Sequence, residues 1–429
     1  MTRARRTPAH AGPARRAAAL TAAAAVGLLL VPPAPAGAAE TGEECPTADD
    51  PFIEQKSAAI INLGFPQSWE LATGAGVTVA VVDSGVDVDN LHLGPDVVLP
   101  GTSFVSGPGV TADGRSDLYG HGTAVAGVIA AREIEGSGLV GTARDAKILP
   151  VQVFVSEGDD DVYNTGEPNS ALMAAGIRWA VDNGADVINV SMSTDSEDAD
   201  LPSLTQALDY AQSEDVVVVA SAGNHAPASE DDALTASRYP AANENVIGVA
   251  ATNTTGVVDA YTVHGPGSDV AAPGQNVLVA SLGNRGDCVG GVDRPYSSWA
   301  APFVAGLAAQ LRELYPQASA EEIVYRILAS ADRPRLGYSD PVQGWGQIRP
   351  VEALTMTIDP TIPGPPLPRG LKRERPEATA DVKALGAAVD PWADARQAAL
   401  WWGLGGVGLT ALALIVRPAT RRRTASAEV

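Results

Sequence analysis

The sequence predicts an α/β fold in which a parallel sheet carries helices on both faces, followed by one C-terminal transmembrane helix. Two observations predict the sheet. Short runs rich in valine and isoleucine recur between residues 70 and 350, and segments with helical spacing separate them. A third observation, an uncharged stretch near the C-terminus, predicts the membrane span.

The predicted strands are continuously apolar, which is typical of strands buried on both faces. They cover residues 77–82, 147–154, 187–190, 216–219 and 246–250. Residues 171–183 and 204–213 lie between strands and have the spacing of amphipathic helices. In such a sheet the functional site lies at the carboxyl ends of the strands, so the residues that follow these runs are the first candidates.

The composition allows a large buried core and excludes a disordered chain, since 45% of the 429 residues are hydrophobic and 19% are charged. The formal net charge is −22. Residues 1–38 contribute +5 and residues 417–429 contribute +3, so the remaining residues carry −30. A body this acidic repels phosphate backbones, and nucleic acid is therefore not an expected partner. The charge suits a solvated extracellular domain or a preference for basic substrates, and both interpretations remain open.

Composition divides the chain into six segments. Residues 1–38 have the pattern of a secretion signal, because arginines precede an apolar run and small residues at Ala36 and Ala38 offer a cleavage site. The other predicted segments are an N-terminal arm (39–65), the folded body (66–356), a proline-rich linker (357–397), a transmembrane helix (398–416) and a basic cytoplasmic tail (417–429).

The stretch 398–416 holds 19 uncharged residues, enough helix to cross a hydrocarbon core of about 30 Å. Trp401 and Trp402 lie at its start, where indoles favour the headgroup level, and four arginines follow its end. By the positive-inside rule we expect a single-pass protein of the cell membrane whose body is extracytoplasmic. The alternative, a buried terminal helix, is disfavoured because the stretch has no polar face.

The chain contains two cysteines, Cys45 and Cys288. In an oxidising compartment an even pair predicts a disulfide, which would join the N-terminal arm to a segment ten residues before Ser298. Two free thiols are the alternative. The acidic run at residues 157–161 lacks the spacing of a calcium loop, so we interpret it as a solvated loop and predict no metal site.

Four motifs at the ends of predicted strands or the starts of helices carry polar side chains. Asp83 ends the first strand, and His121 opens a helix of small residues. Asn224 follows the Val-rich strand at 216–219, where its side-chain amide can donate to an oxyanion. Ser298 precedes an alanine-rich helix, so backbone N–H groups surround its hydroxyl, and Pro302 is expected in the first turn.

Each motif also has an ordinary structural interpretation. Acidic residues end many strands as turn formers or helix caps, and asparagine is common in turns. Three other histidines, His92, His225 and His264, lack comparable surroundings, and we expect them on the surface or in loops.

Together the four motifs resemble the subtilisin family (the subtilases) over residues 66–350, because Asp, His and Ser occur in that order and no G-x-S-x-G motif is present. The resemblance implies a subtilisin-like fold and a serine endopeptidase without a cofactor. It implies that Ser298 is the nucleophile, His121 its general base and Asp83 the carboxylate that orients the imidazole.

The same resemblance assigns further roles. Asn224 and the Ser298 amide would form the oxyanion hole, and Ser191, Met192 and Ser193 would contact the substrate backbone and rim the specificity pocket. Two positions depart from the family pattern. Ser193 and Tyr296 stand where glycine is usual, and a phenol at Tyr296 would strain the backbone or narrow the cleft if glycine were required there.

The arrangement of signal, cysteine-bearing arm, body, linker and single span resembles the mycosins, membrane-anchored proteases that accompany type VII secretion systems of actinobacteria. The resemblance implies protein or peptide substrates, a lipid bilayer contacted through the C-terminal helix, and the type VII secretion machinery as a partner. The arm is short for a folding-assistant propeptide, so we expect it to stay attached. The alternative function is a catalytically weak or inactive scaffold subunit of a membrane secretion complex.

Overall fold

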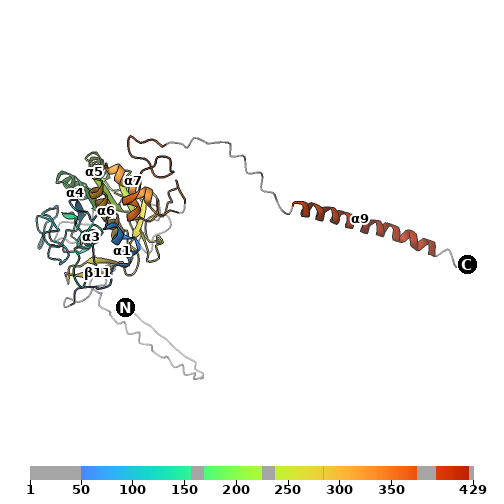
Figure 1. The fold of residues 1–429 in the computed structure, drawn as a ribbon, viewed down its shortest axis with the longest axis horizontal. Helices are drawn as coiled ribbons and strands as arrows, with labels where there is room; N and C mark the ends of the chain where they lie inside the picture. Colours follow the sequence, from blue (N-terminus) through green and yellow to red (C-terminus); the bar gives the residue numbers. More distant parts are fainter. Residues whose placement is uncertain are drawn as a thin grey trace, which may run out of the picture.

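The central element of the computed structural model is a seven-stranded sheet with the order β2-β3-β1-β4-β6-β8-β9, in which every neighbouring pair is parallel. Figure 1 shows the fold with its helices labelled. The structure describes residues 50–155, 169–224, 237–283, 285–333, 335–373 and 393–424. The strands are β1 (Thr78–Asp83), β2 (Thr102–Ser103), β3 (Lys147–Gln152), β4 (Val187–Val190), β6 (Val217–Ser221), β8 (Val246–Thr252) and β9 (Val270–Pro273). The predicted parallel sheet is confirmed.

The order of the strands reverses at β1, which lies between β3 and β4. Such a switch point is where open parallel sheets place their ligands, just outside the carboxyl ends of the strands. β1 extends one residue beyond its predicted end, because Asp83 is still in register with Gln152 of β3. The carboxylate of Asp83 is therefore held by regular strand geometry and not by a loop.

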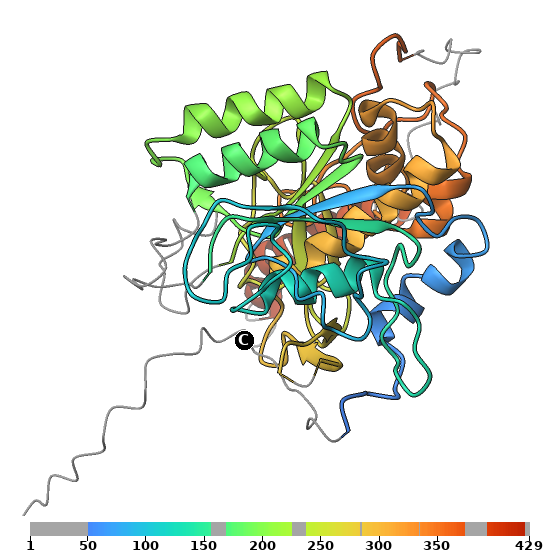
Figure 2. The same cartoon turned by 90° about the vertical axis from the view of Figure 1, so that its left-hand side faces the viewer.

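Helices cover both faces of the sheet, as the apolar strands require. Helices α4 (Ser170–Asp182) and α5 (Leu201–Ser213) lie side by side on one face, where they are green in Figure 2. Helices α3 (His121–Ala130) and α6 (Ser297–Leu314) lie on the other face. Alternate residues of β1 serve the two layers: Val79 and Val81 pack with α3 and α6, whereas Ala80 and Val82 pack with α4 and α5.

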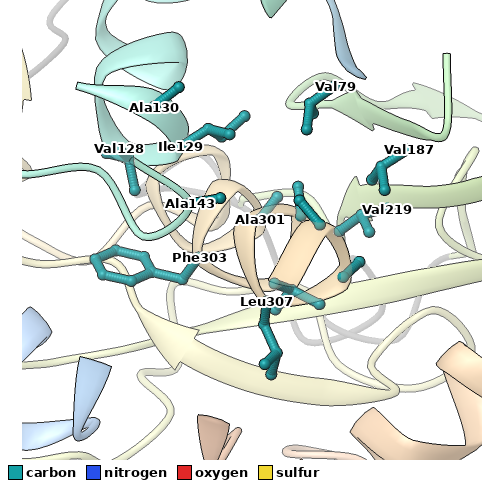
Figure 3. Close-up of a cluster of buried hydrophobic side chains, with 14 of the residues drawn as sticks. Val79, Val128, Ile129, Ala130, Ala143, Val187, Val219, Ala301, Phe303 and Leu307 are labelled. Carbon is teal, nitrogen blue, oxygen red and sulfur yellow. The ribbon is translucent and has the colours of Figure 1, made fainter. Parts of the chain in front are cut away.

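Helix α6 lies at the centre of the larger core and packs across five strands of the sheet. Figure 3 shows Ala301, Phe303 and Leu307 of α6 together with side chains of α3 and of the strands. Phe303 and Leu307 are buried, and burying a side chain of this size contributes about 1.5–3 kcal/mol. The start of α6, which carries Ser298, is thereby fixed relative to the sheet.

Smaller elements complete the body. They are helices α1 (Ala58–Asn62), α2 (Phe65–Ser68), α7 (Ala320–Ser330) and α8 (Pro350–Thr355), the antiparallel pair β5 (Thr194–Asp195) with β7 (Arg238–Tyr239), and the antiparallel pair β10 (Val277–Ala280) with β11 (Asp287–Gly290). The described part of the N-terminal arm lies along β11, where the Asp287 amide donates to the Pro51 carbonyl at 2.8 Å.

His92 was expected on the surface or in a loop; it lies in a turn, but it is not on the surface. Its side chain is fully buried, with Nε2 2.8 Å from Asp287 Oδ1 and Nδ1 2.6 Å from the Arg132 carbonyl oxygen. These partners are far away in the sequence, so the residues around His92 gave no indication of them. His264 is half-buried in a loop, and His225 lies outside the described residues.

Cys288 is buried in β11 and is not a free cysteine. Cys45 lies outside the described residues, as do the predicted signal segment and the acidic run at 157–161, so the pairing of Cys45 with Cys288 stays a prediction. The first part of the predicted linker lies against the body, where Pro365 and Pro368 are buried and the Arg369 amide donates to Glu321 Oε2 at 2.8 Å. It does not extend away from the body before residue 373.

Helix α9 (Ala393–Thr424) contains the window Ala395–Ile415, which is long and apolar enough to cross a membrane by length and composition. None of this window is buried against the rest of the described chain. The window includes most of the predicted span at residues 398–416.

Candidate active site

The carboxyl edge of the sheet gathers the predicted residues of β1, β4 and β6. Asp83 is the last residue of β1, Ser191 follows the end of β4, and Asn224 lies three residues after β6. Because these strands are parallel neighbours, their carboxyl ends meet at one edge. Helix α3 begins with His121 and α6 has Ser298 as its second residue.

Asp83 and His121 form the best defined contact of this edge. The His121 Nδ1 atom lies 2.8 Å from Asp83 Oδ1, which also accepts a hydrogen bond of 2.8 Å from the Ser84 amide. Asp83 is fully buried and His121 is 8% exposed. A carboxylate accepts the Nδ1 proton, which leaves Nε2 as the basic nitrogen of a neutral imidazole.

Close packing of α3 on β1 produces this contact. A Cβ atom at Gly122 would lie 2.1 Å from the Gly85 carbonyl oxygen and 3.2 Å from Asp83 Cβ, so no larger residue fits. The glycine after His121 thus lets the start of the helix approach the tip of the strand. The small residues that the sequence shows in this helix serve the same approach.

Ser298 is brought to this edge by packing. The indole of Trp299 lies against the imidazole of His121, with ring centroids 4.9 Å apart. This contact places the residue after Ser298 directly beside the imidazole of His121.

Pro302 is not in the first turn of its helix, contrary to the prediction. Helix α6 begins at Ser297, so Pro302 is its sixth residue and cannot donate to the Ser298 carbonyl. The Ser191 hydroxyl replaces that donor at 3.0 Å, and Ser191 accepts in turn from Asn189 Nδ2 at 2.9 Å. Ser191, predicted to contact substrate, is buried and uses its side chain to hold the segment of Ser298.

Asn224 is held by the residue before Ser298. Its Oδ1 atom accepts from the Ser297 amide at 2.9 Å and from the Ser297 hydroxyl at 3.1 Å. The same hydroxyl accepts from the Gly223 amide at 3.1 Å. With Oδ1 occupied, the Nδ2 hydrogens of Asn224 face away from Ser297. The sequence analysis did not single out Ser297 for this task; its position next to Ser298 was the available signal.

The other two predicted substrate residues differ in exposure. Met192 is buried in the core that the sheet forms with α4 and α5, so its side chain supports the site through packing. Ser193 is half-buried, and its hydroxyl approaches Gly223 so closely that a Cβ there would lie 3.1 Å away. Of the three predicted residues, Ser193 has the side chain best placed for contact with a ligand.

Tyr296 does not adopt a conformation that requires glycine. Its φ of −117° and ψ of 134° are extended and open to any residue. Its ring meets that of Tyr261 edge-on, with centroids 5.5 Å apart. Burial, followed by the nearby Asp293 carboxylate, raises the pKa of Tyr296 to about 12, so the phenol stays neutral.

Asp117 is a second buried carboxylate of this edge that the sequence analysis missed. Burial raises the pKa of Asp117 to about 6, hydrogen bonds from Gly120 and Thr123 oppose that increase, and the nearby Asp83 adds to it. The available signal was an acidic residue four positions before His121, at the entrance of a helix whose N-cap is Gly120.

The fold and the residues at this edge define a subtilisin-type serine protease. The chain belongs to the subtilase family, because the family model with the description "Subtilase family" matches residues 74–346. It is similar to mycosin-1 of Mycobacterium tuberculosis (strain ATCC 25618 / H37Rv), at 36% identity over 339 residues that cover 70% of this chain and 73% of mycosin-1. It is similar to thermitase of Thermoactinomyces vulgaris, at 33% identity over 265 residues that cover 62% of this chain and 85% of thermitase.

Comparison with solved structures supports the same relationship. The crystal structure of MycP1 from Mycobacterium smegmatis superposes with a TM-score of 0.62 at 28% identity, covering 78% of this chain and 94% of that chain. The chain is therefore a subtilase-type serine protease related to the mycosins.

Proposed function

We propose that this protein is an active serine endopeptidase that cleaves exported or cell-envelope proteins, with Ser298, His121 and Asp83 as its catalytic residues. The observation that carries the proposal is the 2.8 Å contact between His121 Nδ1 and the buried Asp83 carboxylate, at the edge where α6 presents Ser298. A buried carboxylate orients the imidazole and stabilises the imidazolium that forms during acyl transfer.

The proposed mechanism has two stages, acylation of Ser298 and hydrolysis of the acyl-enzyme. His121 Nε2 removes the proton of the Ser298 hydroxyl as Oγ attacks the substrate carbonyl carbon, and the resulting imidazolium protonates the leaving amine. The Ser298 amide, in the first turn of α6, and Asn224 Nδ2 donate to the oxyanion of the tetrahedral intermediate. Water then hydrolyses the acyl-enzyme by the same transfers in reverse order.

The proposal includes an extracytoplasmic body anchored by α9, whose apolar window supports a single membrane span. A signal peptide at residues 1–38 and a disulfide between Cys45 and Cys288 belong to the same proposal. A related solved structure, at 29% identity and a TM-score of 0.60, is described as the serine protease MycP1, an essential component of the type VII (ESX-1) secretion system. By this relation we assign the type VII secretion machinery as the expected partner.

The alternative function is a scaffold subunit of a membrane secretion complex with weak or absent catalysis. The sequence feature that raises it is Tyr296, which stands two residues before Ser298 where the family usually has glycine. In a scaffold the biological effect would depend on binding and not on the Ser298 hydroxyl.

Labelling with a fluorophosphonate probe separates the two functions. The full chain in native membranes is compared with Ser298→Ala and with Ser203→Ala, which replaces an exposed serine of α5. We expect wild type and Ser203→Ala to be labelled and Ser298→Ala to be unlabelled. A correctly folded wild type that takes up no probe would contradict the protease function. Full secretion of type VII substrates by cells that carry Ser298→Ala would support the scaffold function.

A further inference from the structure

The carboxylate of Asp117 connects the two elements that carry the Asp83–His121 pair. It lies in the loop before α3 and is 7% exposed. Its Oδ1 atom accepts from the Ser84 hydroxyl at 3.0 Å, the Tyr119 amide at 3.0 Å and the Gly120 amide at 2.8 Å. Its Oδ2 atom accepts from the Thr123 amide at 2.9 Å and the Thr123 hydroxyl at 2.7 Å.

Ser84 extends this connection to the tip of β1. Its amide donates to Asp83 Oδ1 at 2.8 Å, and its hydroxyl accepts from the Gly122 amide at 2.9 Å while donating to Asp117. The Ser84 hydroxyl therefore links Ser84, the residue after Asp83, to Gly122, the residue after His121. Asp117 fixes the direction of that hydroxyl when it is ionised, because a carboxylate can only accept.

We propose that Asp117 is a positioning residue, which through Ser84 holds the tip of β1 and the first turn of α3 at the distance that the Asp83–His121 hydrogen bond needs. The inference rests on the proposed protease function and deepens it. The five hydrogen bonds of the Asp117 carboxylate come from Ser84, Tyr119, Gly120 and Thr123. Asp117 acts only through Ser84 and the start of α3.

A helix cap alone does not explain this arrangement. The N-cap position of α3 is Gly120, which has no side chain, and a cap needs one acceptor for the first free amides. Asp117 accepts five hydrogen bonds, and one of them comes from Ser84, the residue that follows β1. Among the ion pairs of the described residues none involves Asp117, so dipoles alone stabilise its charge.

The charge of Asp117 is costly, which argues for a task that a neutral residue performs less well. Burial disfavours its ionised form and so does Asp83, the charged group facing it from β1; His121 is the titratable group on α3. An asparagine would retain one oxygen and place an amino group opposite two or more N–H or O–H donors. A displacement of about 1 Å in a catalytic group can cost about 100-fold in rate.

The test compares Asp117→Asn, Ser84→Ala and the double variant in the full chain. The matched control is Asp269→Asn, which replaces a half-buried carboxylate whose pKa is also raised to about 6 and which accepts from the Gly248 amide at 2.8 Å. We expect kcat to fall about 10- to 100-fold in Asp117→Asn and Ser84→Ala, with KM within about 2-fold. The double variant should lose little more than the worse single variant, because both act through one hydrogen bond.

A spectroscopic readout tests the position without turnover. The proton of the His121 Nδ1–H···Asp83 hydrogen bond gives a far-downfield ¹H NMR resonance, which His121→Ala assigns. We expect this resonance to be lost in Asp117→Asn and Ser84→Ala, and to persist in Asp269→Asn. The buried His92 provides a second downfield resonance as an internal control for folding.

The outcomes are separable. If the resonance and kcat of both variants match wild type, the inference is wrong. If Asp117→Asn does not fold, Ser84→Ala decides by the same two readouts. If wild type takes up no fluorophosphonate but its His121 resonance depends on Asp117, the protease function fails and the positioning role stands.

Discussion

The Ser191 hydroxyl donates a hydrogen bond of 3.0 Å to the backbone carbonyl of Ser298. Within an α-helix this carbonyl would accept from the amide four residues later, but that residue is Pro302, which has no N–H group. The side chain at the end of β4 thus completes the hydrogen bonding of the first turn of α6. The sheet and the helix are joined at the residue proposed as nucleophile.

This relationship predicts a rescue. Ser191→Ala leaves the partly buried Ser298 carbonyl without the hydroxyl donor, and an unsatisfied acceptor of this kind costs up to about 1–3 kcal/mol of unfolding free energy. Adding Pro302→Ala supplies an N–H group at the helical position, so we expect the double variant to recover most of the loss. Urea unfolding followed by tryptophan fluorescence measures both. Two losses that simply add would contradict the account.

The buried pair of His92 and Asp287 predicts a large loss of stability on a conservative change. His92 Nδ1 lies against the Arg132 carbonyl oxygen, which can only accept, so Nδ1 is the donor of that hydrogen bond. The other ring nitrogen, Nε2, lies 2.8 Å from Asp287 Oδ1. Removing one partner of a buried pair costs about 3–5 kcal/mol. We expect this loss for Asp287→Asn in denaturant unfolding.

The same variant should loosen the N-terminal arm, because Asp287 Oδ2 also accepts from the Ile53 amide at 2.9 Å. Limited proteolysis, followed on reducing gels, should therefore cleave the arm faster than in wild type. Asp89→Asn is the matched control, since its ion pair with Arg285 is exposed and such pairs contribute only about 0–1 kcal/mol. Equal free energies of unfolding for Asp287→Asn and Asp89→Asn would contradict the predicted loss of stability.

These features show which parts of the molecule can be predicted from sequence. The strands and the residues at their ends follow from local patterns, because a valine-rich run buried on both faces needs no knowledge of its neighbours. The environment of His92 depends on Asp287, 195 positions later, and no local pattern encodes that pairing. Asp117 was overlooked for a related reason, since its partner Ser84 lies 33 positions earlier.

Asp269 predicts a pH dependence of stability. Burial raises its pKa to about 6 from an ordinary 3.8, and the hydrogen bond from the Gly248 amide opposes that increase. The folded state therefore favours the protonated carboxyl. This contribution to stability is complete below pH 3.8 and is lost as the pH rises through about 6.

Asp269→Asn removes the titration and keeps an oxygen that can accept from Gly248. We expect the variant and wild type to be equally stable at pH 3.5, and the variant to be more stable by up to about 3 kcal/mol at pH 8. Denaturant unfolding of both proteins across this range gives the difference, in which all other titrating groups cancel. A difference that does not change with pH would refute the prediction.

Tyr296 predicts that restoring the glycine usual in the family does not improve the enzyme. The backbone is extended there, so glycine relieves no strain, and its flexibility costs about 0.5–1 kcal/mol. Loss of the edge-to-face contact with Tyr261 costs about 0.5–1.5 kcal/mol more. We therefore expect Tyr296→Gly to unfold more easily while its rate constant for labelling by a small fluorophosphonate stays within about 2-fold of wild type.

Tyr296→Phe is the control, because it keeps the ring and removes the hydroxyl, which donates a long hydrogen bond of 3.3 Å to Asp293. It should match wild type in both stability and labelling. A labelling rate in Tyr296→Gly that rises about 10-fold or more, with Tyr296→Phe unchanged, would mean that the ring obstructs access to Ser298. The departure from the family pattern would then limit catalysis by shape, since the extended backbone excludes strain as its cause.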